Sequence, residues 1–169
     1  MQGLTRRELL LAAACWNEVL HAQSFKYLDA ATASEIEAIA EAILPGDQTP
    51  GAREAGVIWF IDGSLAGYDK DKQALYKKGL AETQARRTAL FPASASIASL
   101  TPEQRIQLLQ HIEKTEFFAL VRRHTVLGFF GHPRYGGNRN GASVKLLGFK
   151  ESMMYSPPFG YYDREAAAK

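Results

Sequence analysis

Cysteine is almost absent from this chain: Cys15 is the single one among 169 residues. One cysteine cannot form a disulfide within the chain, and it cannot supply a cysteine-based metal cluster. Long apolar runs are also missing, since none approaches the ~20 residues that a membrane-spanning helix needs. Cations and acids nearly balance to a net charge of +2, which gives no indication of nucleic-acid binding. What is left, a chain of 46% apolar residues, is long enough for one domain with a true core.

The motifs of common enzyme classes are missing too. The chain has no GxSxG elbow and neither of the usual glycine-rich nucleotide-binding motifs. Its histidines are His21, His111, His124 and His132. None of them forms the i, i+4 pair of a zinc-binding helix, so we expect ordinary polar or partly exposed histidines. The sequence therefore predicts no catalytic, cofactor-binding or metal-binding residue in this chain.

The first residues resemble a signal for export. Arg6 and Arg7 are followed by an apolar run that ends at Trp16, and this arrangement resembles the twin-arginine signal of bacteria. We predict a twin-arginine signal segment over residues 1–22 and a single helical domain over residues 23–169. The alternative is an amphipathic N-terminal helix that stays on the mature protein.

Apolar residues recur at steps of three and four along most of the chain, which predicts helices. The expected ranges are 32–44, 52–66, 69–91 and 102 to about 130. The last of these is predicted to be the central helix, with Leu127 and Phe130 on its buried side. Sustained alternation of apolar and polar residues is missing, so a sheet is not expected. The predicted fold class is all-α: a small helical bundle with a long, loop-rich C-terminal extension.

Residues that cap helices mark the expected starts. Thr32 or Ser34 is expected to cap the first helix, and Asp69 the third. Thr101 gives the strongest start signal, because a proline follows it at the first helical position and a glutamine stands three residues after it.

The segment 128–149 is the most unusual part of the sequence. It concentrates glycines, asparagines and cations between aromatic ends. Gly136, Gly137 and Asn138 can each take a positive φ, so together they allow a tight reversal that larger side chains would block.

The residues on both sides of this reversal are expected to project outward. They are Arg134 and Tyr135 before it and Arg139 and Asn140 after it. Tyrosine and arginine dominate the hot spots of protein–protein interfaces. An ordered loop that only packs on its own helices is the alternative.

The run PRYGGN at 133–138, six residues before VKLLGF at 144–149, resembles the C-terminal signature of the gluconate 2-dehydrogenase subunit 3 family. The segments 49–56 and 100–104 are also similar to that family, so the resemblance covers nearly the whole chain. It implies a small, non-catalytic subunit that accompanies a large flavoprotein dehydrogenase of the glucose–methanol–choline type, which oxidises sugars or sugar acids.

The resemblance also implies where the cofactor and the partners belong. FAD is expected in the large subunit and no cofactor in this chain, and a cytochrome c subunit is a possible further partner. The small subunit is expected to support folding, export and stability of the large one. The expected location is the periplasm, reached by the twin-arginine route, with membrane association through the complex.

The residues expected to bind the partner are Pro133, Arg134, Tyr135, Gly136, Gly137, Asn138, Arg139, Phe149, Phe159 and Tyr161. Two other functions stay open. One is a stand-alone enzyme that uses His132 or His124 as a base beside Arg134 and Tyr135. The other is a protein-binding module without a redox partner.

Overall fold

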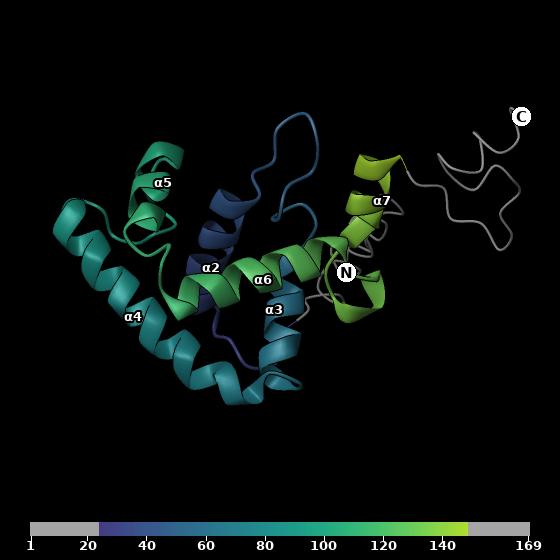
Figure 1. Ribbon diagram of the computed structural model, residues 1–169, viewed down its shortest axis with the longest axis horizontal. Helices are drawn as coiled ribbons and strands as arrows, with labels where there is room; N and C mark the ends of the chain where they lie inside the picture. The colour runs from purple at the N-terminus through teal and green to yellow at the C-terminus, as the bar shows by residue number, and fades with distance from the viewer. Residues whose placement is uncertain (1–23, 149–169) are drawn as a thin grey trace, which may run out of the picture.

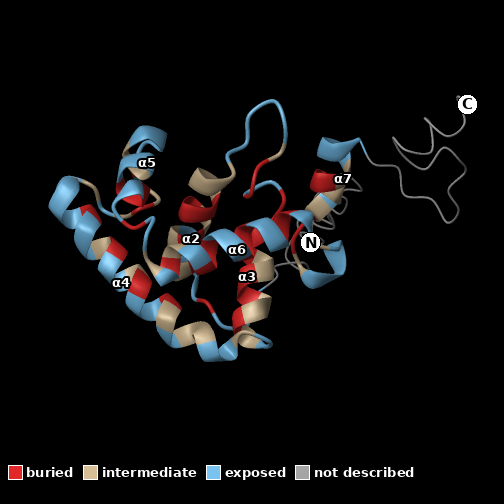
Figure 2. Cartoon of the chain, in the orientation of Figure 1, coloured by how far each residue is buried: buried red, intermediate tan, exposed pale blue. Residues whose placement is uncertain are grey.

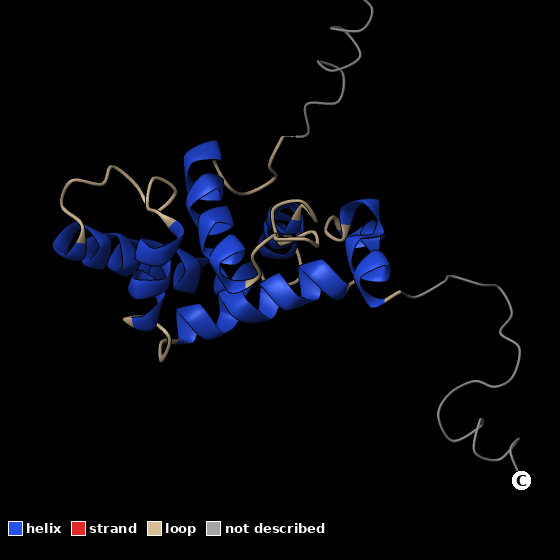
Figure 3. Ribbon diagram, turned by 90° about the horizontal axis from the view of Figure 1, so that it is seen from above, coloured by secondary structure: helices blue, strands red, loops and turns tan. Residues whose placement is uncertain are grey.

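The computed structural model describes residues 24–148, and Figure 1 shows how its helices are arranged. The α-helices are α2 (Ala30–Ile43), α3 (Val57–Ala66), α4 (Gln73–Leu90), α5 (Pro102–Gln110), α6 (Glu116–Phe130) and α7 (Ala142–Leu147). Short 3₁₀ helices lie at η1 (Lys70–Lys72), η2 (Pro133–Tyr135) and η3 (Arg139–Gly141). Loops and turns join them, and the described residues form no strand (Figure 3). The predicted all-α class is therefore confirmed.

Several predicted features fall outside the described residues. They are the boundary between 22 and 23, Arg6, Arg7, Phe149, Phe159, Tyr161 and most of the C-terminal extension. Within residues 24–148, no helix is both long enough and apolar enough to cross a membrane.

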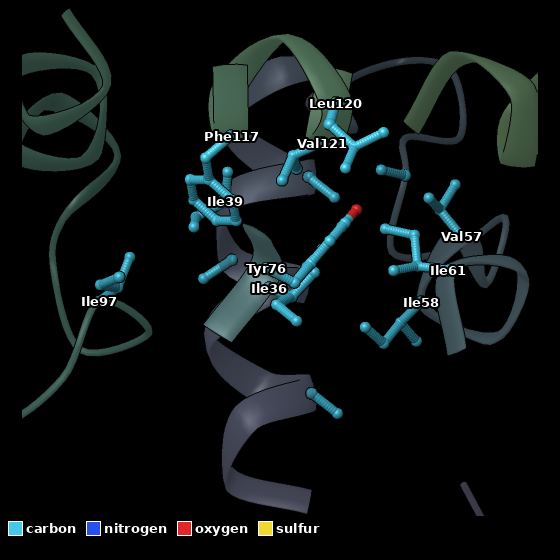
Figure 4. Close-up of a cluster of buried hydrophobic side chains, with 14 of the residues drawn as sticks. Ile36, Ile39, Val57, Ile58, Ile61, Tyr76, Ile97, Phe117, Leu120 and Val121 are labelled. Atoms are coloured by element: carbon cyan, nitrogen blue, oxygen red, sulfur yellow. The ribbon is translucent and has the colours of Figure 1, made fainter. Parts of the chain in front are cut away.

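The core forms around α6, which packs against α2, α3 and α4 (Figure 1). Ile39 of α2, Ile61 of α3 and Val121 of α6 are completely buried and lie in this cluster (Figure 4). Complete burial of an aliphatic side chain of this size contributes about 1.5–3 kcal/mol to folding. The shared apolar faces thus fix α6 in the middle of the bundle, as predicted for the central helix.

The predicted helix over 102–130 is wrong in one respect: it is two helices with a turn between them. α5 ends at Gln110, and α6 starts at Glu116 with Thr115 as its N-cap. The Thr115 side chain accepts a hydrogen bond from the Phe118 amide at 3.2 Å and donates one to the Ile112 carbonyl at 2.7 Å. Thr115 thus satisfies a free carbonyl at the end of the preceding turn and a free amide at the start of α6, so a new helix begins here.

This break changes which side of α6 is buried. The buried residues include Leu120, His124 and Gly128. Leu127 and Phe130 were predicted to be buried, but they are 44% and 46% exposed. The prediction assumed that all apolar residues of the helix face the core. In the structure, His124 and Gly128 occupy part of the buried face instead.

The other helix starts agree with the sequence only in part. Thr101 caps α5, and its side chain and that of Gln104 satisfy each other's backbone amides, as predicted. The cap of α2 is Asp29, which accepts from the Thr32 amide at 2.8 Å, so neither Thr32 nor Ser34 caps this helix. The second helix starts at Val57 rather than at 52, after a turn that ends in Gly56 with φ 64°.

The first described residues are fixed to α3 by one buried carboxylate. Asp62, only 2% exposed, accepts hydrogen bonds from the backbone amides of Lys26, Tyr27 and Leu28 at 2.8, 2.9 and 2.9 Å. Three such bonds satisfy a buried charge that would otherwise be costly. The folded domain thus has a defined N-terminal attachment at residues 26–28.

Candidate partner-docking surface

The loop over residues 131–141, called the docking loop below, lies directly on the backbones of α6 and α3. A Cβ atom on Gly137 would stand 2.1 Å from the Gly128 carbonyl oxygen, so only glycine permits this contact with α6. Gly136 has φ 102°, and a Cβ atom there would stand 3.1 Å from the Trp59 carbonyl oxygen of α3. Gly136 thus takes the positive φ that the sequence predicted, whereas Gly137 does not and serves close approach alone.

Asn138 holds the two ends of the docking loop together. It is 2% exposed and has a positive φ of 48°. Its Nδ2 donates to the Gly131 carbonyl at 2.9 Å, and its Oδ1 accepts from the Ser143 amide of α7 at 3.0 Å. Asn138 and Gly137 are buried, so they can serve a docking surface only by giving it shape.

Arg134 and Tyr135 are exposed, as expected. Tyr135 is 55% exposed, and Arg134 donates a hydrogen bond to its hydroxyl at 2.9 Å. The Arg134 guanidinium also lies 4.8 Å from the centre of the tyrosine ring. His132 accepts from the Arg134 amide through Nδ1 at 3.2 Å. The 133–135 turn thus presents a paired aromatic and guanidinium group, with Pro133 exposed beside them.

Arg139 does not project outward, which corrects the prediction for this side of the loop. Its amide donates to the Ala55 carbonyl at 2.9 Å, and its guanidinium lies 4.8 Å from the centre of the Trp59 ring. Burial lowers the pKa of Arg139 from its ordinary value. Trp59 also stacks on Phe25 at 4.3 Å between ring centres. Arg139 therefore fixes the loop to α3, while Asn140 remains exposed.

A second exposed element lies next to the docking loop, and the sequence did not predict it. Along α6, exposed residues recur at steps of three and four and define what we call the α6 stripe (Figure 2). Its members are Ala119, Arg122, Arg123, Val126, Leu127 and Phe130. All but Phe130 line a shallow groove of about 460 Å³. The sequence did contain a sign of this stripe. This part of the helix has more apolar residues than one buried face of a helix can hold.

His124 lies in the core, not at the surface. It is 1% exposed, with Nδ1 2.9 Å from the Tyr76 hydroxyl and Nε2 3.2 Å from Oδ2 of Asp69. Burial lowers the pKa of His124, although Asp69 acts in the opposite direction. Burial also raises the pKa of Tyr76, so the phenol stays protonated and donates a hydrogen bond to Nδ1. The expectation of a polar or partly exposed residue is wrong for His124.

The contacts of His124 bear on two predictions. Asp69 was expected to cap the third helix, but its side chain caps neither η1 nor α4 and instead accepts from His124. The Tyr76 hydroxyl points toward α6 inside the core (Figure 4). His124 contacts neither Arg134 nor Tyr135, so the structure does not form the base that the stand-alone enzyme would need at this position.

Another pocket lies between α2 and α4. It has a volume of about 380 Å³ and a mainly apolar lining that includes Leu28, Ile36 and Leu80. Among residues 24–148, no three His, Cys, Asp or Glu side chains are grouped so that they could hold a metal ion.

Comparison with known proteins places the chain within a family. The family model described as gluconate 2-dehydrogenase subunit 3 matches residues 30–151, well over half of the chain. The match includes the docking loop and the α6 stripe. Neither the curated proteins nor the solved structures contain a match.

Proposed function

The chain belongs to the gluconate 2-dehydrogenase subunit 3 family, and from this premise we propose that it is the non-catalytic small subunit of an FAD-dependent sugar or sugar-acid dehydrogenase. Its family is one of subunits, so the chain acts within a dehydrogenase complex. The large subunit of the proposed complex is a flavoprotein of the glucose–methanol–choline type. It holds the FAD and carries out the oxidation, and a cytochrome c subunit accepts electrons where the complex includes one.

The observation that supports this role is the rigid, exposed turn of the docking loop. Arg134 and Tyr135 contact each other in the open, while the buried Asn138 and the glycine contacts hold the backbone beneath them. A surface that is ordered before binding loses less conformational entropy when a partner docks. Its arginine and tyrosine are also the residue types that contribute most to interfaces.

The proposed role extends to export. The chain would carry the folded large subunit to the periplasm through the twin-arginine pair Arg6 and Arg7, and the complex would associate with the membrane. The residues of this signal lie outside the described structure, so this part of the proposal is supported by the sequence alone.

Co-expression with the large flavoprotein subunit tests the proposal. We expect the wild-type chain to co-purify with a flavin-containing partner by size exclusion. The double variant Arg134→Ala/Tyr135→Ala should bind at least about 30-fold more weakly, since hot-spot residues each contribute about 2 kcal/mol or more. An obligate interface of this kind buries more than about 2,000 Å². Other contacts therefore remain in the double variant, and we expect a partial rather than a complete loss of binding.

A matched control uses the same residue types away from the loop. Tyr68 is 91% exposed and Arg86 is exposed on α4, so Tyr68→Ala/Arg86→Ala should leave binding unchanged. Equal binding by both double variants would exclude the docking loop as the contact. Failure of the wild-type chain to co-purify with any flavoprotein would contradict the proposed function itself.

The isolated chain distinguishes this role from the stand-alone enzyme. Under the proposal, the purified chain is colourless and does not oxidise aldoses with an artificial electron acceptor. Turnover that disappears in a His132→Ala variant would instead support the histidine-dependent enzyme.

A further inference from the structure

The α6 stripe is a second surface that the docking loop does not explain. Val126, Leu127 and Phe130 are 46%, 44% and 46% exposed, although the opposite side of the same helix forms the core. Neighbouring apolar side chains that remain half exposed on a folded domain mark a site of interaction. Their helix is fixed by packing against α2, α3 and α4, so the stripe is a preformed surface.

The charged members of the stripe, Arg122 and Arg123, are both cations, and the exposed Glu116 lies one turn before the stripe on the same helix. The sequence has no aspartate or glutamate between Glu116 and Glu151, so every charged residue in that interval is a lysine or an arginine. Arg122 and Arg123 are both exposed at the groove. Neither forms an ion pair with another described residue.

The groups around Arg123 carry charge of both signs. Lys72 lies close enough to Arg123 for their charges to interact, and Asp69 and Asp71 also lie close to Lys72. Asp71 pairs with Lys72 at 2.8 Å, and Asp69 accepts from His124 at 3.2 Å. The groove therefore combines apolar side chains with the guanidinium groups of Arg122 and Arg123, which form no ion pair with another described residue. The near-zero net charge of the whole chain concealed this local excess.

We propose that the α6 stripe binds an acidic, amphipathic helix of the large subunit. The inference rests on the proposed function and adds to it the chemistry of the partner surface. Residues at steps of three and four along one helix make a ridge-and-groove surface that a second helix fits at 8–10 Å between axes. The apolar face of that helix covers Val126, Leu127 and Phe130, and its carboxylates pair with Arg122 and Arg123.

Nucleic acids and anionic membranes also bind basic surfaces, but both fit the α6 stripe less well. A phosphate backbone gains nothing from apolar side chains, because nucleic-acid binding depends on contacts between cations and phosphates. A helix that lies on an anionic membrane keeps its cations on the polar face and its apolar residues on the other, whereas Arg122 and Arg123 share one surface with Val126 and Leu127.

Charge reversal within the co-expressed complex tests the inference. We expect Arg122→Glu/Arg123→Glu to weaken assembly roughly tenfold or more. Arg122→Gln/Arg123→Gln should reduce the salt dependence of binding between 50 and 300 mM NaCl. Arg86→Glu, an exposed reversal on α4, serves as the matched control and should have no effect. Circular dichroism checks that each variant keeps its helices.

A photo-cross-linking residue in place of Val126 identifies the occupant. A cross-link to an acidic helical peptide of the large subunit supports the inference. A cross-link to residues 149–169 of the same chain overturns it, as does binding of the isolated chain to phosphatidylglycerol vesicles that the glutamate variant loses.

The two proposals fail in different ways. If the charge reversals leave the complex intact while Arg134→Ala/Tyr135→Ala disrupts it, the α6 inference is wrong and the proposed function stands. If the wild-type chain forms no flavin-containing complex, both proposals fall.

Discussion

His124 places an ionisable group among the apolar residues of the core, where it joins Tyr76 of α4 to Asp69. Burial favours its neutral form, and the neutral ring can accept from the phenol while it donates to the carboxylate. The sequence could not show this arrangement, because the partners lie 48 and 55 residues away along the chain. The spacing of the histidines in the sequence bears only on whether they can bind a metal ion together, and it does not show which of them are buried.

We expect the burial of His124 to make the domain less stable in mild acid. Its pKa is lowered by burial in the folded state, whereas the unfolded side chain titrates near its ordinary value of about 6.5. As the pH falls below about 6.5, the unfolded state binds the proton first, so the free energy of unfolding decreases. Thermal denaturation between pH 7.5 and pH 5 should show this loss, and a His124→Gln variant should show less of it.

Two other groups must be considered in that experiment. Glu37 acts in the opposite direction, because burial raises its pKa and favours its protonated form in the folded state. It titrates in both proteins, so the comparison with His124→Gln removes its contribution. Tyr76→Phe gives an independent check, since it leaves Nδ1 without its donor and should cost about 1 kcal/mol. An identical pH dependence in the wild type and His124→Gln would refute the assignment.

Asn138 and Asn140 allow the hydrogen bonds of the docking loop to be measured. Both have positive φ, of 48° and 56°, so glycine fits either backbone. Asn138→Gly removes the contacts to Gly131 and Ser143 and should cost about 1–3 kcal/mol. Asn140→Gly, at an exposed residue, should be nearly neutral. Urea denaturation of the two variants compares them, and equal stabilities would mean that the Asn138 contacts contribute nothing.

At the scale of helices, α4 and α6 approach each other more closely than α3 approaches its surroundings near Gly63. A Cβ atom on Gly79 of α4 would stand 2.2 Å from Cγ of Phe117, and nothing lies within 4 Å of one on Gly63 of α3. Phe117 is buried and lies edge-on to Tyr76, so it has little room to move. The glycine in α4 therefore sets how closely the two helices pack.

Opposite effects on stability are expected for the same substitution at these two helical glycines. Gly63→Ala should stabilise the domain by about 0.5–1 kcal/mol through higher helix propensity. Gly79→Ala should destabilise it by about 1–3 kcal/mol, because the added methyl group overpacks the core. Chemical denaturation measures both, and a stabilised Gly79→Ala protein would show that α4 and α6 can separate at little cost.

Helices were predictable where the signal was local. The capping box at Thr101 placed the start of α5 correctly, because all of its groups lie within four residues. The turn between α5 and α6 was not recognised, although the apolar spacing breaks there: Ile112 and Phe117 lie five residues apart, not three or four. Thr115 caps α6, but in the sequence it cannot be distinguished from any other polar residue on the exposed face of a helix.

At the scale of the molecule, the sequence indicated the fold class and the docking loop but not the α6 stripe. Arg134 and Tyr135 were identified by residue type alone, since neither depends on a distant contact for its exposure. The stripe depends on which side of α6 meets the other helices, and only the packing of the whole bundle decides that. The same packing leaves Arg122 and Arg123 together on one exposed surface. Acidic residues in other parts of the sequence keep the net charge of the chain near zero.

The three amides bound by Asp62 bear on where the folded domain begins. They hold residues 26–28 from within α3, and Leu28 enters the core directly behind them. A cut at any bond before residue 24 would leave these amides and Leu28 in place. If the signal segment proposed for residues 1–22 is cleaved, the domain that follows therefore keeps the contacts that fix its first residues.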